Sequence, residues 1–323
     1  MSAPDAIGAV VALVCWVLIS AACGSGDGVE TSPTGSPPSS PAAIPDRSPT
    51  ELELPIRIAV TLPVFEEFAR RAGLEHVEVI SLIPPGADPH GYEFSASDIE
   101  RIKGIDFFFV NGLGLDNRLK GVIEANRDSR ARVIPFAPNI LSPQGGGITA
   151  EQASDNPHLW LDPTLAYVYT EIVADELIIY DGVRQGDYDR NFEAHRDELV
   201  ALQVEIQATL SAISPERRTI VTTHDSFQHF ARRFELSIAG FAAAESDGAV
   251  SELEIQRLAG LVAERQAPAV FAEYGYGMAA MREVADRAGV PLCTLYTDIL
   301  GDGMDYQSMM RANAAELVRC LSG

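Results

Sequence analysis

The stretch Asp187–Ser214, DYDRNFEAHRDELVALQVEIQATLSAIS, decides how the chain is organised. Its apolar side chains recur at spacings of three and four residues, which places them on one face of a single α-helix. At about 1.5 Å of rise per residue, this helix would be roughly 40 Å long, more than one small domain requires. We therefore predict that residues 187–214 form a helix linking two domains. His195 falls on the apolar face, where we expect a packed core residue rather than a metal ligand.

Alternating strand and helix patterns lie on both sides of this helix. Such alternation is typical of an α/β fold with parallel sheets. We predict two parallel-sheet α/β domains, residues 51–186 and 215–323, joined by the long helix. The predicted strands are residues 56–62, 77–83, 106–110 and 132–136 before the helix, and 219–223, 236–241, 270–272 and 291–296 after it.

The N-terminal segment has the pattern of an export signal. Residues 6–22 are a nearly continuous apolar run that ends in small residues before Cys23. This resembles a bacterial lipoprotein signal, so we expect residues 1–23 to be a signal peptide and Cys23 to carry the lipid. The protein would then be extracytoplasmic and anchored to the cell membrane; an uncleaved membrane anchor is the alternative. Residues 24–50, rich in Gly, Ser and Pro, are predicted to be a disordered tether.

Charge and cysteine content narrow the function further. The formal net charge is −22 at pH 7, which argues against a nucleic-acid partner, whose phosphates require a basic surface. An acidic balance suits a protein that binds cations. Beyond Cys23 the chain has only Cys293 and Cys320, which we predict to form a disulfide in an oxidising compartment. Two buried thiols are the alternative.

Three histidines and one aspartate stand in similar positions. His90, His224 and Asp298 each come shortly after a predicted strand, and His158 lies in a proline-bounded loop. Ligands of open α/β sheets bind at the carboxyl ends of the strands. Three imidazoles and a carboxylate suit zinc, and two of the four residues fall in each half. The sequence therefore predicts a metal site in the cleft between the domains.

Four motifs surround these residues: Gly86–Glu93 (GADPHGYE), Asn156–Pro163 (NPHLWLDP), His224–Phe227 (HDSF) and Tyr296–Asp298 (YTD). Together they resemble the metal-site motifs of the zinc/manganese substrate-binding proteins of ABC transporters. The resemblance implies two α/β domains joined by one rigid helix, with a metal bound between them. It implies capture of a divalent metal outside the membrane and delivery to an ABC permease, with no catalysis. We expect a monomer.

The histidine at position 224 favours zinc as the bound substrate, because manganese-binding members usually carry a glutamate there. Manganese or iron remains an alternative metal. A zinc hydrolase is a less favoured alternative, because four protein ligands would leave no open position for water. A cell-surface adhesin is compatible with the lipid anchor. The loop 142–156 contains no histidine, so we do not expect it to gather zinc.

Other residues are candidates for supporting the site. A metal-bound imidazole usually donates its second N–H to a carboxylate or carbonyl. Glu273, Asp225 and Asp162 are the candidate carboxylates. Glu273 could also be a ligand itself, whereas helix capping and turn formation explain Asp225 and Asp162 equally well. Tyr274 and Tyr276 are candidates to line the cleft, and Trp160 is expected to anchor the loop of His158 in the core.

Overall fold

The computed structural model of the protein describes residues 55–142, 155–243 and 250–323. The predicted signal peptide (1–23, including Cys23) and tether (24–50) lie outside these residues, as does most of the loop 142–156. All the described residues belong to one compact unit of the chain. No helix among them is long and apolar enough to cross a membrane.

The first half of the described chain builds a four-stranded parallel sheet in the order β2-β1-β3-β4. Every residue of the inner strand β3 is buried, as expected for a parallel strand covered on both faces. The strands lie where the apolar segments predicted them. They are β1 (Ile56–Val60), β2 (Val77–Ser81), β3 (Phe107–Val110) and β4 (Arg132–Pro135), accompanied by helices α1 (Glu66–Gly73), α2 (Ala96–Arg101), α3 (Asn117–Asn126) and α4 (Phe136–Ile140).

The second half contains two parallel strand pairs, β5-β6 and β7-β8. The β5 and β7 strands lie side by side, and hydrogen bonds between backbone and side-chain atoms connect them. The backbone N–H of Glu273 donates to Thr223 Oγ1 at 3.1 Å, and that of His224 donates to Glu273 Oε1 at 2.8 Å. The elements are β5 (Thr219–His224), α7 (Gln228–Phe234), β6 (Ser237–Ala243), α8 (Glu252–Arg265), β7 (Val270–Glu273), α9 (Met278–Ala288), β8 (Leu292–Leu295) and α10 (Tyr306–Leu321).

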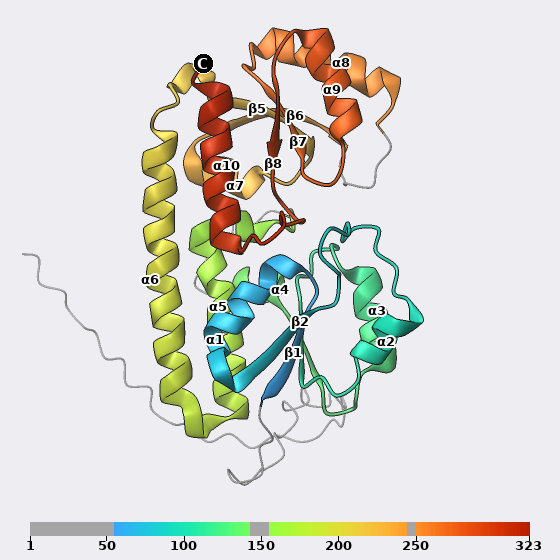
Figure 1. The fold of residues 1–323 in the computed structure, drawn as a ribbon, viewed down its shortest axis with the longest axis vertical. Helices are drawn as coiled ribbons and strands as arrows, with labels where there is room; N and C mark the ends of the chain where they lie inside the picture. Colours follow the sequence, from blue (N-terminus) through green and yellow to red (C-terminus); the bar gives the residue numbers. More distant parts are fainter. Residues whose placement is uncertain (1–54, 143–154, 244–249) are drawn as a thin grey trace, which may run out of the picture. The chain divides into compact units, whose positions relative to one another are not determined.

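Helices α5 (Pro163–Tyr180) and α6 (Gln185–Leu210) connect the halves. The α6 helix packs against α1 and α5 from the first half and against α10 from the second. In Figure 1 this packing is visible where the yellow-green to yellow α6 runs beside the red α10. One hydrophobic core extends from β1 through α5 and α6 to α10. The predicted α/β class with a long connecting helix is therefore confirmed, while the exact domain boundaries, 51–186, 187–214 and 215–323, stay predictions.

His195 is fully buried on α6, as expected for a core residue. Its Nδ1 lies 2.8 Å from the hydroxyl of Thr170 on α5, and its Nε2 lies 3.3 Å from Glu67 on α1. Glu67 also accepts a hydrogen bond from the backbone N–H of Tyr306, the first residue of α10, at 2.8 Å. The histidine thus belongs to a polar contact that ties α6 to both halves.

Candidate metal centre

The four predicted ligands come together in the structure. His90 lies in the loop between β2 and α2, His158 directly precedes the short 3₁₀ turn η3 (Leu159–Leu161), and His224 ends β5. Asp298 follows β8. One donor atom from each of the four residues lies within 4.8 Å of the other three. His158, His224 and Asp298 are buried, and the His90 side chain is 9% exposed.

The spacing of the donor atoms suits a small cation. The Nε2 atoms of His158 and His224 are 3.1 Å apart. Asp298 Oδ1 is 3.4 Å from His158 Nε2, and Oδ2 is 3.6 Å from the Nε2 atoms of both His90 and His224. Zinc bonds of about 2.0–2.1 Å in a tetrahedron separate the ligand atoms by about 3.3 Å. These four separations are therefore close to those that a four-coordinate ion requires, and the remaining pairs lie within 4.8 Å.

Two of these donor atoms lack other partners. Among the described residues, neither His90 Nε2 nor Asp298 Oδ1 has a hydrogen-bond partner, although both are buried. A buried polar atom without a partner is costly, and a bound cation would satisfy both.

Glu273 orients the imidazole of His224. Its Oε1 accepts the backbone N–H of His224, and its Oε2 lies 2.8 Å from Nδ1 of the same ring. The hydroxyls of Ser226 and Thr297 donate to Oε2 at 3.0 and 2.8 Å. Because both carboxylate oxygens are engaged, the contacts favour an orienting role for Glu273 over a role as ligand. They leave Nε2 of His224 directed at the other donors.

Asn156 orients the imidazole of His158 in a similar way. The sequence pattern alone did not single out Asn156 for this role. Its side-chain oxygen accepts the backbone N–H of His158 at 3.1 Å and lies 2.9 Å from Nδ1 of the ring. Nε2 of His158 is left to face the site. The available signal was an asparagine two residues before the histidine, the spacing at which an asparagine side chain caps its own turn. Trp160 packs on His158 with ring centroids 5.2 Å apart, as expected of an anchor for this loop.

The two candidate tyrosines have different surroundings. Tyr276 donates its hydroxyl to Asp298 Oδ2 at 2.8 Å, and its ring lies 5.4 Å from that of His224. Tyr274 is 36% exposed and packs against the ring of Tyr296 at 5.0 Å. Of the two tyrosines, Tyr276 is the one that contacts the predicted ligands.

Asp162 and Asp225 make the contacts expected of capping and turn residues. Asp162 is the N-cap of α5, accepting the backbone N–H of Thr164 at 2.9 Å, and it also pairs with Arg233 at 2.9 Å. The Asp225 carboxylate accepts a hydrogen bond from Gln228 at 2.6 Å. These contacts hold the loops that carry the histidines and do not involve the imidazoles.

The electrostatics of the cluster are strongly coupled. Burial lowers the pKa of His224, but Glu273 and Asp298 outweigh it and raise that pKa to about 9. For His90, Asp298 likewise outweighs burial and raises the pKa, whereas burial prevails at His158 and lowers it. Burial would raise the pKa of Asp298, but the surrounding imidazoles, His158 foremost, hold it well below its usual range. Asp298 is therefore an anionic donor near neutral pH.

A cavity of about 570 Å³ lies beside the cluster. His90 and His158 line it, together with the charged residues Asp155, Asp225 and Arg118. Two of the four predicted ligands are thus reached from this cavity.

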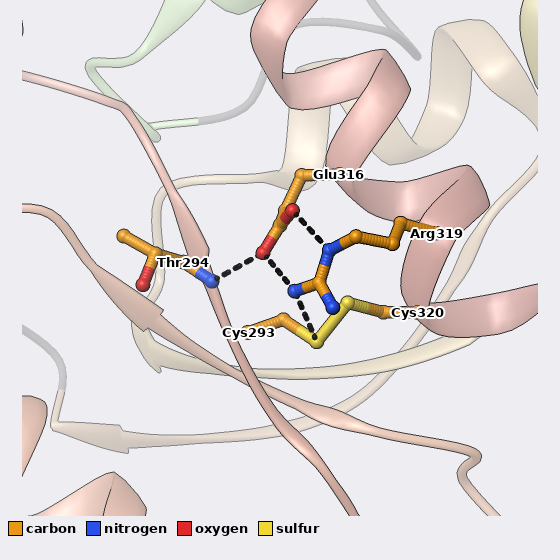
Figure 2. The surroundings of a disulfide bond; sticks show 5 residues. All are labelled: Cys293, Thr294, Glu316, Arg319 and Cys320. Atoms are coloured by element: carbon orange, nitrogen blue, oxygen red, sulfur yellow. Dashed lines mark hydrogen bonds and ion pairs between the residues drawn. A yellow bond between two sulfur atoms is a disulfide. The ribbon is translucent and has the colours of Figure 1, made fainter.

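A disulfide joins β8, the strand that precedes Asp298, to α10. Cys293 and Cys320 are bonded, as the sequence predicted. Figure 2 shows Arg319 beside the bond, with its guanidinium on Glu316 at 2.6 Å and near Cys293 Sγ at 3.6 Å. Glu316 in turn accepts the backbone N–H of Thr294 at 3.1 Å. The bond and these contacts fix the strand that leads to Asp298.

The sequence and the fold are similar to those of known metal-binding proteins. The manganese-binding lipoprotein MntA of Halalkalibacterium halodurans is 28% identical over 273 residues, covering 83% of this chain and 89% of the relative. The zinc-binding protein TroA of Treponema pallidum is 25% identical over 275 residues, covering 82% and 88%. The solved structure of the periplasmic zinc-binding protein TroA from Treponema pallidum matches with a TM-score of 0.74, covering 83% of this chain and 99% of that one at 25% identity.

Residues 58–320 match the family model described as "Zinc-uptake complex component A periplasmic". The chain belongs to this family, which confirms the resemblance found in the motifs. Its members are binding components of transporters rather than enzymes, so the protein is a metal-binding solute-binding component of an ABC transporter.

Proposed function

We propose that the protein captures Zn²⁺ outside the cytoplasm and delivers it to an ABC permease. The observation that carries this proposal is the convergence of three imidazoles and one carboxylate: the Asp298 carboxylate lies 3.4 to 3.6 Å from Nε2 of all three imidazoles, and the Nε2 atoms of His158 and His224 are 3.1 Å apart. The proposed ligands are His90, His158, His224 and Asp298, with Glu273 and Asn156 orienting two of the imidazoles.

The donor set supports zinc over manganese. Imidazole nitrogen suits zinc, whereas manganese prefers carboxylate, carbonyl and water oxygens. A buried set of three nitrogens and one carboxylate also provides the four ligands of a closed tetrahedral site. Manganese is the alternative cargo, because the Halalkalibacterium halodurans relative is named a manganese-binding lipoprotein.

The same four donors weigh against a zinc hydrolase. Hydrolytic zinc sites keep one coordination position for water. Here Asp298 Oδ1, buried and without a hydrogen-bond partner among the described residues, is available for that position. A binding role requires only that the ion be held and released.

The setting we propose is a monomeric lipoprotein anchored to the cell membrane through Cys23. Residues 24–50 would tether the binding body within reach of a permease in the same membrane. Relatives named as lipoproteins support this setting. Labelling of the expressed protein with a radioactive fatty acid, lost in Cys23→Ala, would test the anchor.

Metal content is the direct test of the cargo. The protein would be stripped with a chelator, exposed to equal zinc and manganese, desalted and assayed by mass spectrometry. One zinc per chain with little manganese is the expected result. Manganese held in preference would overturn the choice of cargo, and no retained metal would overturn the proposed site.

A further inference from the structure

We propose that Tyr276 is a specificity-determining residue: its hydroxyl withholds one oxygen of Asp298 from the metal, limits the site to four donors and so favours zinc over manganese. This inference rests on the proposed metal site and adds the means by which that site discriminates. It starts from one contact, the hydrogen bond of 2.8 Å from the Tyr276 hydroxyl to Asp298 Oδ2.

The proton of Tyr276 has three acceptors within reach. Besides Asp298 Oδ2, its hydroxyl lies 2.9 Å from Thr297 Oγ1 and 3.5 Å from Glu273 Oε2. The Thr297 hydroxyl donates its proton to Glu273 Oε2 at 2.8 Å, and the Ser226 hydroxyl donates to the same oxygen. Glu273 is therefore already satisfied. The negatively charged Asp298, at the shortest of the three distances, takes the phenol proton because charge-assisted hydrogen bonds are the stronger ones.

The two oxygens of Asp298 are consequently unequal. Oδ2 shares its electron density with the phenol and lies 3.6 Å from Nε2 of His90 and of His224. Oδ1 lies 3.4 Å from Nε2 of His158, is buried and has no hydrogen-bond partner among the described residues. Oδ1 is thus the better donor to a metal. An ion that drew in Oδ2 as well would have to share that oxygen with Tyr276. Asp298 is therefore biased toward binding through one oxygen, which makes four donors with the three imidazoles.

The backbone keeps the phenol in this place. Tyr276 lies between Gly275 and Gly277, whose φ angles are +94° and +73°, conformations that residues with a Cβ rarely adopt. A Cβ on Gly275 would meet Ile299 Cδ1 at 2.6 Å, and one on Gly277 would meet Thr223 Cγ2 at 2.0 Å. The backbone N–H of Tyr276 donates to the backbone oxygen of Glu273 at 3.2 Å, which closes the turn. The turn between β7 and α9 therefore aims the hydroxyl at Asp298.

Coordination number is where zinc and manganese differ. Zinc is satisfied by four ligands in a tetrahedron, whereas manganese favours six-coordinate, oxygen-rich sites. Restricting Asp298 to one oxygen costs zinc little and deprives manganese of a donor. In Tyr276→Phe the ring against His224 is kept, but Oδ2 loses its hydrogen bond. Oδ2 of Asp298 is then available to bind the metal ion.

The test compares zinc and manganese dissociation constants of the full chain, measured by chelator competition, for wild type, Tyr276→Phe and Tyr274→Phe. Tyr274 belongs to the same turn but does not contact the ligands, so its variant is the matched control. We expect Tyr276→Phe to shift the preference toward manganese by about tenfold, the lower end of effects seen when groups supporting metal ligands are removed. The control should keep the wild-type ratio.

Cobalt(II) provides a second readout that a folding defect alone would not reproduce. Four-coordinate cobalt absorbs visible light far more strongly than five- or six-coordinate cobalt. Strong absorption in wild type and weaker absorption in metal-loaded Tyr276→Phe would support the proposal. An unchanged zinc-to-manganese ratio, or equal losses for both metals with an unchanged cobalt spectrum, would overturn it. If wild type bound neither metal, the proposed function itself would fail and this inference with it.

Discussion

Removing the disulfide between Cys293 and Cys320 should lower the free energy of unfolding substantially. The two cysteines are 27 residues apart in sequence. In the chain-entropy treatment, closing a loop of this length in the unfolded state stabilises the fold by about 3.5 kcal/mol at 25 °C. Both residues are buried, with 2% and 6% of their surface exposed, so the double variant Cys293→Ala/Cys320→Ala also loses the packing of two sulfur atoms.

The metal site should survive this change. The backbone of Tyr296, the residue after β8, forms two hydrogen bonds of 2.8 Å with the side chain of Asn313 on α10. Together with the contact from Thr294 to Glu316, these bonds hold the strand that carries Asp298. We therefore expect lower stability with unchanged zinc affinity.

Urea unfolding of the metal-free protein, followed by circular dichroism, would measure the effect. Wild type reduced with a phosphine keeps both sulfur atoms, so comparing it with the double variant separates cross-linking from packing. The reasoning would be refuted by a loss below about 1 kcal/mol, well under the usual range for a native disulfide. Titration of two free thiols in the oxidised, folded protein would refute it as well, since buried thiols were the alternative.

Three further predictions concern the histidines. His224→Ala should weaken zinc binding by orders of magnitude in a chelator-competition assay, because a ligand is lost. His76 lies away from the site, with its imidazole 3.5 Å from Asp187, so the control variant His76→Ala should bind zinc as wild type does. Equal zinc affinities for wild type and both variants would contradict the assignment. The metal-free pKa of His224 is about 9 and that of His90 is raised. Zinc affinity should therefore fall as pH drops from about 9, with at least about one proton released per zinc near pH 7. Calorimetry in buffers of different ionisation enthalpy counts the released protons, and a count of zero would be incompatible with these shifts. Burial, with Arg232 adding to it, lowers the pKa of His229 to about 4, so the fold holds its neutral form. The contribution of His229 to the free energy of unfolding should be fully present above the pKa of about 6.5 that a histidine has in the unfolded chain, and should fall by about 3 kcal/mol as pH drops to about 4. Urea titrations at several pH values should find a shallower decline of the free energy of unfolding in His229→Gln than in wild type. Parallel pH curves for the two proteins would disprove the contribution.

The sequence predicted the elements of the fold and the meeting of the four ligand candidates because both follow from local rules. Apolar segments indicated the strands, and residues at the carboxyl ends of parallel strands meet at one edge. Helix limits were less accurate. The predicted helix 187–214 is Gln185–Leu210 in the structure. Ile213 continues the apolar spacing and is buried, but it lies in the turn after the helix, so periodicity could not reveal where the helix ends.

The groups around the ligands were harder to predict because they depend on distances between segments far apart in sequence. Glu273 could be named as a carboxylate at a strand end, but its choice of His224 depends on β5 lying beside β7. Tyr276 was one of two plausible tyrosines. Only the turn at Gly275 and Gly277 determines which of them faces Asp298.

The charges of the site explain how the fold can exist with and without its cargo. Asp298 and Glu273 are two buried carboxylates, and burying their charges uncompensated would be costly. In the metal-free protein, the raised pKa values of His224 and His90 favour protons on these imidazoles, which offset the charge of the carboxylate beside them. A Zn²⁺ ion brings positive charge to the same place and takes the lone pairs that those protons occupy. Zinc therefore replaces protons as the positive charge of the buried cluster, so affinity can depend steeply on pH while the surrounding fold is preserved.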